Sequence, residues 1–478
     1  MDIDVVVIGA GLAGLAAANR VAEAGLRVVV LEAGEEDAYL CNSRIATGAL
    51  NMAHTDPTDG PEAVRKAIDA DTEGFADESL ADALAQMAGA AVTWMQAQDI
   101  PMVRSPQTGR WVLAPPKPVS PGLGWQRRGP DIGLRRLGDN LVRRGGRIER
   151  GRRARRLLIE GDRCVGVHAE SEARSADYRA PHTLLADGGF QGNPELVRRF
   201  ISRKPEALVQ RSAGTGRGDA LLMAEAAGAA LTDLTKFYGH VLVQEALHNS
   251  DLWPYPTIDT LASSSIVVDR AGQRFMDEGL GGIAMANVIA GLDDPLSATA
   301  IFDEAQWETA GSIEFVGPNP YLIEWGGSMS SARTLPELAE KIGIAPHALE
   351  ATVIGYNKAL DDGAVMDLDP PHTPGRCFGS ARNAPDRIPL RPIRRPPFHA
   401  IRLCAGLSYT LGGIAIDTGA RVLRPDGRIV PGLLAAGGCT GGIEGGPVAG
   451  YIGGYMKALC LGLIAGDTMI QAQRNRRS

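Results

Sequence analysis

The chain has 478 residues, 44% of them hydrophobic, and a formal net charge of -7. This length exceeds what one hydrophobic core usually organises, so we expect a globular protein with two domains. The negative charge is spread along the sequence and argues against nucleic acid or an anionic membrane as the main partner, because neither would attract the chain.

Targeting and metal-binding signals are missing from the sequence. The first strand is expected at about Ile3, which leaves no room for a basic and apolar leader, and no run of 18 uncharged apolar residues predicts a membrane span. The six cysteines have no paired spacing, and the eight histidines are scattered. We therefore expect a cytoplasmic protein without a metal site.

The first predicted element is a β-branched run that ends at Gly9-Ala-Gly11-Leu-Ala-Gly14, and a second such run ends at Glu32. The glycines allow a tight turn close to a pyrophosphate, and the helix that follows directs its positive end at the anion. Glu32 has the position of an acceptor for ribose hydroxyls. This βαβ order predicts a nucleotide cofactor, lined by Gly9, Gly11, Leu12, Ala13, Gly14, Glu32 and Ala33.

Strands and Ala/Leu helices alternate over residues 1–235, with a helix expected at 134–144 and a strand at 163–168. Aromatic, Pro-containing loops and helices at 335–341 and 348–360 characterise residues 236–375 and predict an inserted domain. Strands expected at 414–417 and 428–430 return to the first domain, which spans 1–235 and 376–478. The ligand crevice is expected between the two domains.

Five further motifs follow along the chain: Asn42–Gly48, Leu185–Asn193, Gly214–Ala220, Gly272–Glu278, and Gly432–Gly437 with Thr440–Gly442. In these motifs and their spacing the chain resembles the flavoprotein subunit family of fumarate reductase and succinate dehydrogenase, which also contains 3-ketosteroid dehydrogenases. The resemblance implies an α/β fold: a Rossmann-type, glutathione reductase-like FAD-binding domain interrupted by an α+β capping domain. The cap would close a substrate over the isoalloxazine ring.

The resemblance also implies a set of FAD contacts beyond the first motif. No histidine stands at Asn42 or Ser43, where the covalently flavinylated members carry one, so we expect non-covalent FAD. Gly438 replaces a Glu that many relatives have. The implied contacts are Asn42, Ser43, Ala46, Thr47, Gly48, Asp187, Gly188, Asp219, Gly437, Gly438 and Gly450.

The chain departs from the fumarate reductases at the positions that handle a dicarboxylate. Their proton-donating Arg, four residues beyond the Glu of the R-F-x-x-E segment, corresponds to Gly282. Their clamping Asn and Arg have no counterpart in Gly445–Gly450. Because charged hydrogen bonds are worth several kcal/mol, we expect neither fumarate nor succinate as a substrate.

Candidate catalytic residues replace the paired histidines that those reductases carry before a T-x-G-G turn. Tyr409 is the leading candidate for a base, since the resemblance implies a substrate-facing position and a Tyr base in the ketosteroid branch, and Ser408 is a possible donor to a carbonyl. Tyr238, His240 and Tyr451 are alternatives, and His54 is a possible substrate neighbour. Each of these residues has a purely structural interpretation as well, as a buried side chain with satisfied hydrogen bonds.

We therefore predict an FAD-dependent dehydrogenase, or desaturase, that acts on CH–CH donors. It would introduce a C=C bond α,β to the carbonyl of a cyclic ketone, of the steroid or small oxo-cyclohexane type, by Tyr-assisted α-proton abstraction and hydride transfer to flavin N5. The alternatives are an enoate or enone reductase of the fumarate reductase type, and a flavoprotein that turns nothing over. No second dinucleotide motif is visible, so the electron acceptor is expected to be external: oxygen, a quinone or a protein.

Overall fold

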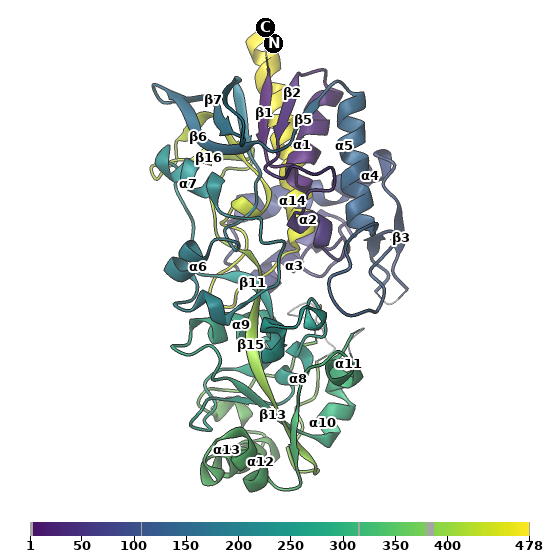
Figure 1. Ribbon diagram of the computed structural model, residues 1–478, viewed down its shortest axis with the longest axis vertical. Coiled ribbons are helices and arrows are strands. Elements are labelled where there is room, and N and C mark those ends of the chain that lie inside the picture. Colours follow the sequence, from purple (N-terminus) through teal and green to yellow (C-terminus); the bar gives the residue numbers. More distant parts are fainter. Residues whose placement is uncertain (1–2, 107, 314–315, 378, 380–386, 478) are drawn as a thin grey trace.

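The computed structural model describes residues 3–106, 108–313, 316–377, 379 and 387–477. A six-stranded sheet, here called the β1 sheet, lies in the half of the molecule that carries both termini (Figure 1). Its strands run parallel except β16, in the order β16-β17-β9-β1-β2-β5. They are β1 (Val5–Ile8), β2 (Val28–Leu31), β5 (Arg147–Glu149), β9 (His182–Leu185), β16 (Arg421–Leu423) and β17 (Ile429–Ala435).

Apolar runs form the central strands because both faces of a parallel sheet are covered by helices. All four residues of β1 are buried, and α1 packs against both α5 and α14. The helices of this half are α1 (Leu12–Glu23), α2 (Asn42–Ile45), α3 (Pro61–Thr72), α4 (Glu78–Ala97), α5 (Gly129–Arg143), α6 (Pro194–Phe200), α7 (Asp219–Ala226) and α14 (Gly454–Arg477). Two smaller antiparallel sheets join β3 (Met102–Arg104) with β4 (Trp111–Leu113), and β6 (Arg153–Glu160) with β7 (Arg163–Glu170) and β8 (Ser175–Arg179).

The second six-stranded sheet, here called the β15 sheet, is built on the long strand β15 (Phe398–Thr410), which reaches from the far end of the molecule toward the β1 sheet (Figure 1). Its other strands are β10 (Val209–Gln210), β11 (Phe237–Val243), β12 (Ile266–Val268), β13 (Thr299–Asp303) and β14 (Ser330–Ala332). The helices around it are α8 (Asp259–Ser263), α9 (Gly282–Gly291), α10 (Glu304–Glu308), α11 (Pro318–Glu324), α12 (Leu335–Ile342) and α13 (Pro346–Asp361).

The predicted elements are found with small shifts in their ends. The α/β class is confirmed, the helices expected at 134–144, 335–341 and 348–360 are α5, α12 and α13, and the strand expected at 163–168 is β7. Every helix in the described part of the chain is too short or too polar to span a lipid bilayer. The division into 1–235, 236–375 and 376–478 stays a prediction.

Three expectations about local structure were wrong. The first strand begins at Val5 and not at about Ile3. The segment after 236 is strand β11 and not a loop, because its apolar residues Val241–Val243 are buried beside β15. Residues 414–417 form isolated bridges, from Ile414 to Leu231 and Thr440 and from Ile416 to Val422, and no strand.

Candidate active site

The turn between β1 and α1 forms a cradle of bare backbone. Gly9 has a φ of 95°, and a Cβ there would lie 2.6 Å from the carbonyl oxygen of Ala186. A Cβ at Gly14 would lie 2.0 Å from the carbonyl oxygen of Gly9, so only glycine fits either position. The N-terminus of α1 therefore meets the end of β1 without side chains between them, which suits an approaching phosphate.

Glu32 fixes this cradle through both of its carboxylate oxygens. Oε2 accepts the backbone N–H of Ala10 at 2.9 Å, and Oε1 accepts that of Gly34 at 2.8 Å. Burial raises the pKa of the carboxyl, while these backbone hydrogen bonds oppose the shift. Each oxygen keeps a further lone pair for a ribose hydroxyl.

A second group of the predicted residues lies against the cradle. A Cβ at Gly437 would lie 2.9 Å from that of Ala13, and one at Gly438 would lie 3.6 Å from Gly188 Cα. Asp187 Oδ2 accepts from the backbone of Ala220, whereas its buried Oδ1 has no hydrogen-bond partner among the described residues. Burial raises the pKa of this carboxyl to about 7.

These features fit the FAD that the resemblance implies. A buried oxygen without a protein partner and a surface that admits only glycine both suit a bound polar group at this place. Asn42 and Ser43 border the same region: the Asn42 amide donates to the carbonyl of Ser408, and Ser43 Oγ accepts from the backbone of Leu12.

Other predicted FAD contacts are placed elsewhere. Asp219 pairs with Arg153 at 2.7 Å and lines a separate hollow between β6 and α7. Gly450 borders the pocket described next, against α3. Ala46, Thr47 and Gly48 follow α2, and the Gly48 carbonyl accepts from Leu113 of β4.

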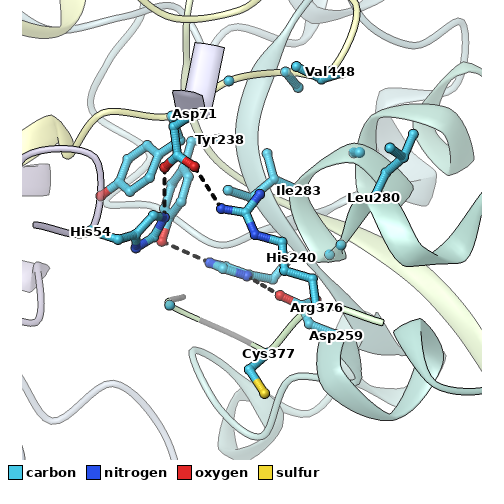
Figure 2. Close-up of a pocket in the computed structure, with 17 residues that line it drawn as sticks. His54, Asp71, Tyr238, His240, Asp259, Leu280, Ile283, Arg376, Cys377 and Val448 are labelled. Carbon is cyan, nitrogen blue, oxygen red and sulfur yellow. Dashed lines mark hydrogen bonds and ion pairs between the residues drawn. The ribbon is translucent and has the colours of Figure 1, made fainter. Parts of the chain in front are cut away.

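A pocket lies where β11, α9 and the segment around Arg376 face α3 and the segment before α14 (Figure 2). Four of the sequence candidates line it: His54, Tyr238, His240 and Tyr451. Tyr409 and Ser408 are not among its lining residues. The pocket therefore brings together the alternative candidates rather than the leading one.

A line of hydrogen bonds runs from Asp259 through His240 to Tyr238 (Figure 2). His240 Nδ1 lies 2.5 Å from Asp259 Oδ2, and its Nε2 lies 2.9 Å from the Tyr238 hydroxyl. Because the Asp259 carboxylate only accepts, Nδ1 carries the proton and Nε2 accepts from the Tyr238 O–H. Burial lowers the pKa of His240, which keeps the ring neutral.

Three tyrosine rings gather at the end of this line. Tyr238 stacks on Tyr451 with 4.1 Å between ring centroids, and Tyr409 lies 5.3 Å from Tyr238. Burial raises the pKa of all three phenols. For Tyr409 the carboxylate of Glu444, which accepts its O–H at 2.9 Å, raises the pKa further. A phenolate on Tyr409 is therefore disfavoured.

A second polar group lines the other wall of the pocket. Arg376 pairs with Asp71 at 3.0 Å, and His54 Nε2 lies 3.4 Å from the other Asp71 oxygen. Burial, together with the charge of Arg376, lowers the pKa of His54 to about 3, so this ring is neutral. The group carries one positive and one negative charge.

The two positions that distinguish the chain from a dicarboxylate reductase both line the pocket. Val448 and Ala449 present apolar side chains from the last glycine-rich segment. Gly282 lies against α8, where a Cβ would be 1.8 Å from Asp259 Cγ. Asp259 thus fills the space that a side chain at residue 282 would need.

Sequence reasoning missed Asp71, Asp259, Arg376 and Glu444. Asp71 is one of three acids in α3 and Asp259 is the one acid in α8, and nothing in their spacing marks them. Glu444 had a detectable signal in its partner: Lys457 stands inside the apolar run Met456–Leu463 of the last helix. A lysine at such a position predicts a buried counter-ion.

Lys457 and Glu444 form an almost fully buried ion pair, with Nζ 2.9 Å from Oε2. Lys457→Met is expected to lower the free energy of unfolding by about 3 to 5 kcal/mol, because Glu444 would keep a buried charge without its partner. Denaturant unfolding at saturating FAD measures this loss. The double variant Lys457→Met/Glu444→Gln should regain most of it, and a loss below about 1 kcal/mol in the single variant would contradict the argument.

The chain matches the FAD binding domain family over residues 4–450. Fumarate reductase (cytochrome) of Shewanella frigidimarina is 26% identical over 457 residues, which cover 92% of this chain and 72% of that protein. 4-Oxocyclohexanecarboxylate 2-dehydrogenase of Sinomonas cyclohexanicum is 29% identical over 347 residues, or 69% of this chain and 58% of that protein.

A solved structure shares the fold over the whole molecule. The crystal structure of 3-ketosteroid-delta4-(5alpha)-dehydrogenase from Rhodococcus jostii RHA1 is similar with a TM-score of 0.71 at 22% sequence identity. The similarity covers 98% of this chain and 97% of that one.

Proposed function

Because the chain belongs to the FAD binding domain family, we propose that it is a dehydrogenase that uses FAD to introduce a C=C bond beside the carbonyl of a cyclic ketone. The observation that carries this proposal is the hydrogen-bonded line from Asp259 through His240 to Tyr238, which ends in the pocket. Such a line moves a proton at a fixed place, and removal of an α-proton is the part of this reaction that needs a base.

The cofactor would be held by the cradle of Gly9 and Gly14, by Glu32, and by Asp187 beside them. When bound, FAD accepts the hydride that leaves the β-carbon of the substrate. We keep the prediction that it is bound non-covalently.

The proton step belongs to Tyr238. Its O–H proton passes to His240 Nε2, and the resulting imidazolium is stabilised by Asp259 at Nδ1. The Tyr238 oxygen then takes the α-proton of the ketone, and the electron pair of that C–H bond becomes the second bond of the C=C unit as the β-hydride departs. Tyr451, which lines the pocket and stacks on Tyr238, would donate a hydrogen bond to the carbonyl oxygen.

The charges of the pocket disfavour a dicarboxylate. Among the residues that the structure describes, the charged ones that line the pocket are Asp71, Asp259 and Arg376, since both histidines are neutral. These residues carry no net positive charge, so a dianion bound among them would lack the opposite charge that buried carboxylates need. Two relatives in sequence or structure carry names that specify cyclic ketones, 4-oxocyclohexanecarboxylate and a 3-ketosteroid, and this supports a ring ketone as the reacting group.

The reverse reaction is the second candidate, because the similarity to fumarate reductase covers 92% of the chain. In that direction His240 would first take up a proton from solvent, and Tyr238 would donate its proton to the α-carbon of an enone and regain one from Nε2 of the His240 imidazolium. The residues would be the same, and the direction would depend on the external electron partner.

Anaerobic mixing of the purified flavoprotein with cyclic ketones tests the proposal. We expect 4-oxocyclohexanecarboxylate or a saturated 3-oxosteroid to bleach the oxidised flavin and to yield the enone, while fumarate leaves reduced flavin unchanged. Reoxidation of reduced flavin by an enone, with no bleaching by any ketone, would establish the reductase instead. Rapid reoxidation by fumarate would contradict both the substrate class and the charge argument.

A further inference from the structure

Arg211 is a buried cation beside the pocket, directly after β10. Its guanidinium donates to Ser408 Oγ at 2.8 Å and to the carbonyl oxygen of Pro254 at 2.9 and 3.2 Å. These acceptors are neutral, and no ion pair joins Arg211 to a carboxylate among the residues that the structure describes. A buried charge without a counter-ion is costly, so its presence calls for a functional reason.

The strand order brings Arg211 to the face of the sheet that carries His240. β10 and β11 lie on either side of β15. Gln210 of β10 and Gly239 of β11 pair with the same β15 residue, Leu407. The side chain of Arg211 then crosses β15 over Gly406, where a Cβ would lie 3.2 Å from Arg211 Cδ. Gly406 is the cross-strand partner of His240.

A bulge in β15 explains how the strand presents these groups. The register shifts between Tyr238 and Gly239, so that Tyr238 faces Tyr409 while Gly239 faces Leu407, and Ser408 has no partner in β11. Bulges of this kind redirect a side chain, and here Ser408 meets the guanidinium. Ser408, proposed from sequence as a donor to the substrate, thus holds Arg211 in the structure.

The groups around the Tyr238 hydroxyl come from every neighbouring element. Burial raises the pKa of Tyr238 and the charge of Arg211 opposes this shift; Tyr255 and Asp259 of α8 raise the pKa further, and a hydrogen bond with Tyr451 lowers it. Tyr451 contacts it from the segment before α14, and Tyr409, held by Glu444, from β15. Burial and the charge of Arg211 lower the pKa of His240 while Asp259 raises it, and the ring is neutral before the proton moves. Of the residues named here around the Tyr238 hydroxyl, Arg211 is the one that carries a positive charge.

We propose that Arg211 is a positioning residue that stabilises the anion left on Tyr238 when its proton passes to His240, an inference that rests on the proposed function. Proton transfer creates two charges, an imidazolium and a phenolate. Asp259 stabilises the first through its contact with Nδ1 and offsets the repulsion between Arg211 and the imidazolium, while Arg211 stabilises the second. Ser408 and Pro254 hold the guanidinium in place without neutralising it.

Deuterium exchange at the α-carbon of a cyclic ketone tests this inference. With the flavin chemically reduced beforehand, the ketone cannot be oxidised, and exchange in D2O followed by NMR reports the proton step alone. For Arg211→Gln we expect exchange to slow at least about tenfold near neutral pH and its pH profile to move upward by one unit or more, because the phenolate loses its cation.

Arg211→Lys keeps the charge and is the rescue variant, with a pH profile expected close to that of the wild type. Arg421→Gln, which removes an exposed arginine paired with Asp417, is the matched control and should change nothing. Bound FAD and the thermal midpoint are measured for every variant.

The outcomes separate this inference from the proposed function. Loss of exchange in Tyr238→Phe together with the shifted profile of Arg211→Gln supports both. The role of Arg211 is overturned if Tyr238→Phe abolishes exchange while Arg211→Gln keeps the wild-type pH profile. It is also overturned if Arg211→Gln and Arg211→Lys lower the thermal midpoint alike and neither shifts the pH profile of exchange. If the wild type exchanges no ketone, the proposed function fails, and this inference fails with it.

Discussion

Tyr238→Phe is expected to lower the rate of flavin reduction by a cyclic ketone about a hundredfold or more, with FAD still bound. The substitution keeps the ring that stacks on Tyr451 and removes only the oxygen that His240 accepts from. Without that oxygen the line of hydrogen bonds from Asp259 ends at His240. Rapid mixing under anaerobic conditions measures the rate, and the flavin absorbance of the purified protein measures the bound FAD.

Tyr409→Phe is the matched control, because it removes a hydroxyl from the neighbouring ring. Glu444 accepts from that hydroxyl and also from the backbone of Ile452, so the carboxylate keeps polar partners in the variant. We expect a small loss of rate, since the charge of Glu444 disfavours a phenolate at residue 409. The opposite result, a slow Tyr409→Phe and a fast Tyr238→Phe, would return the role of base to Tyr409.

The nucleotide-binding part of the molecule was predictable because its constraints are local. A β-branched strand, glycines at a tight turn and an acid at the end of the next strand follow one another within Val5–Glu32, and each has a backbone reason. The same applies to Gly188, whose φ of 91° lies in a region that favours glycine. In both cases the absence of a side chain is the signal, and a sequence displays it directly.

The line of hydrogen bonds from Asp259 through His240 to Tyr238 could be predicted only in part, because its residues come from separate elements of secondary structure. Tyr238 and His240 share one strand and were found as an aromatic cluster, whereas Asp259 comes from α8 and contacts His240 only through the tertiary fold. Arg376 and Asp71 likewise meet across the pocket from positions 305 residues apart. A single acid or arginine has no periodicity or spacing that could reveal such a partner.

Gly282 shows how a departure from a family pattern gains physical meaning in the structure. From sequence, the residue indicated only that the proton-donating arginine of the fumarate reductases is missing. In the structure, Asp259 occupies the space beside it and orients His240. The glycine at residue 282 therefore leaves room for Asp259, which is part of the proton carrier that we propose from Asp259, His240 and Tyr238.

Glu32→Ala is expected to weaken FAD binding about a hundredfold or more. The variant loses acceptors for the backbone N–H groups of Ala10 and Gly34 as well as the predicted ribose contact, and each charged hydrogen bond contributes about 1.5 to 3 kcal/mol. The protein should purify with little yellow colour. Titration of the apoprotein with FAD, followed by quenching of flavin fluorescence, gives the dissociation constant.

The control for this change is Glu36→Ala, which removes the same charge from an exposed position in the loop that follows Glu32. Its FAD affinity should equal that of the wild type, which separates the local contacts of Glu32 from a general effect of negative charge near the cradle. A fully yellow Glu32→Ala protein with unchanged affinity would show that neither the loop geometry nor the ribose contact depends on this carboxylate. The cofactor would then be held by the glycine turn and the N-terminus of α1 alone.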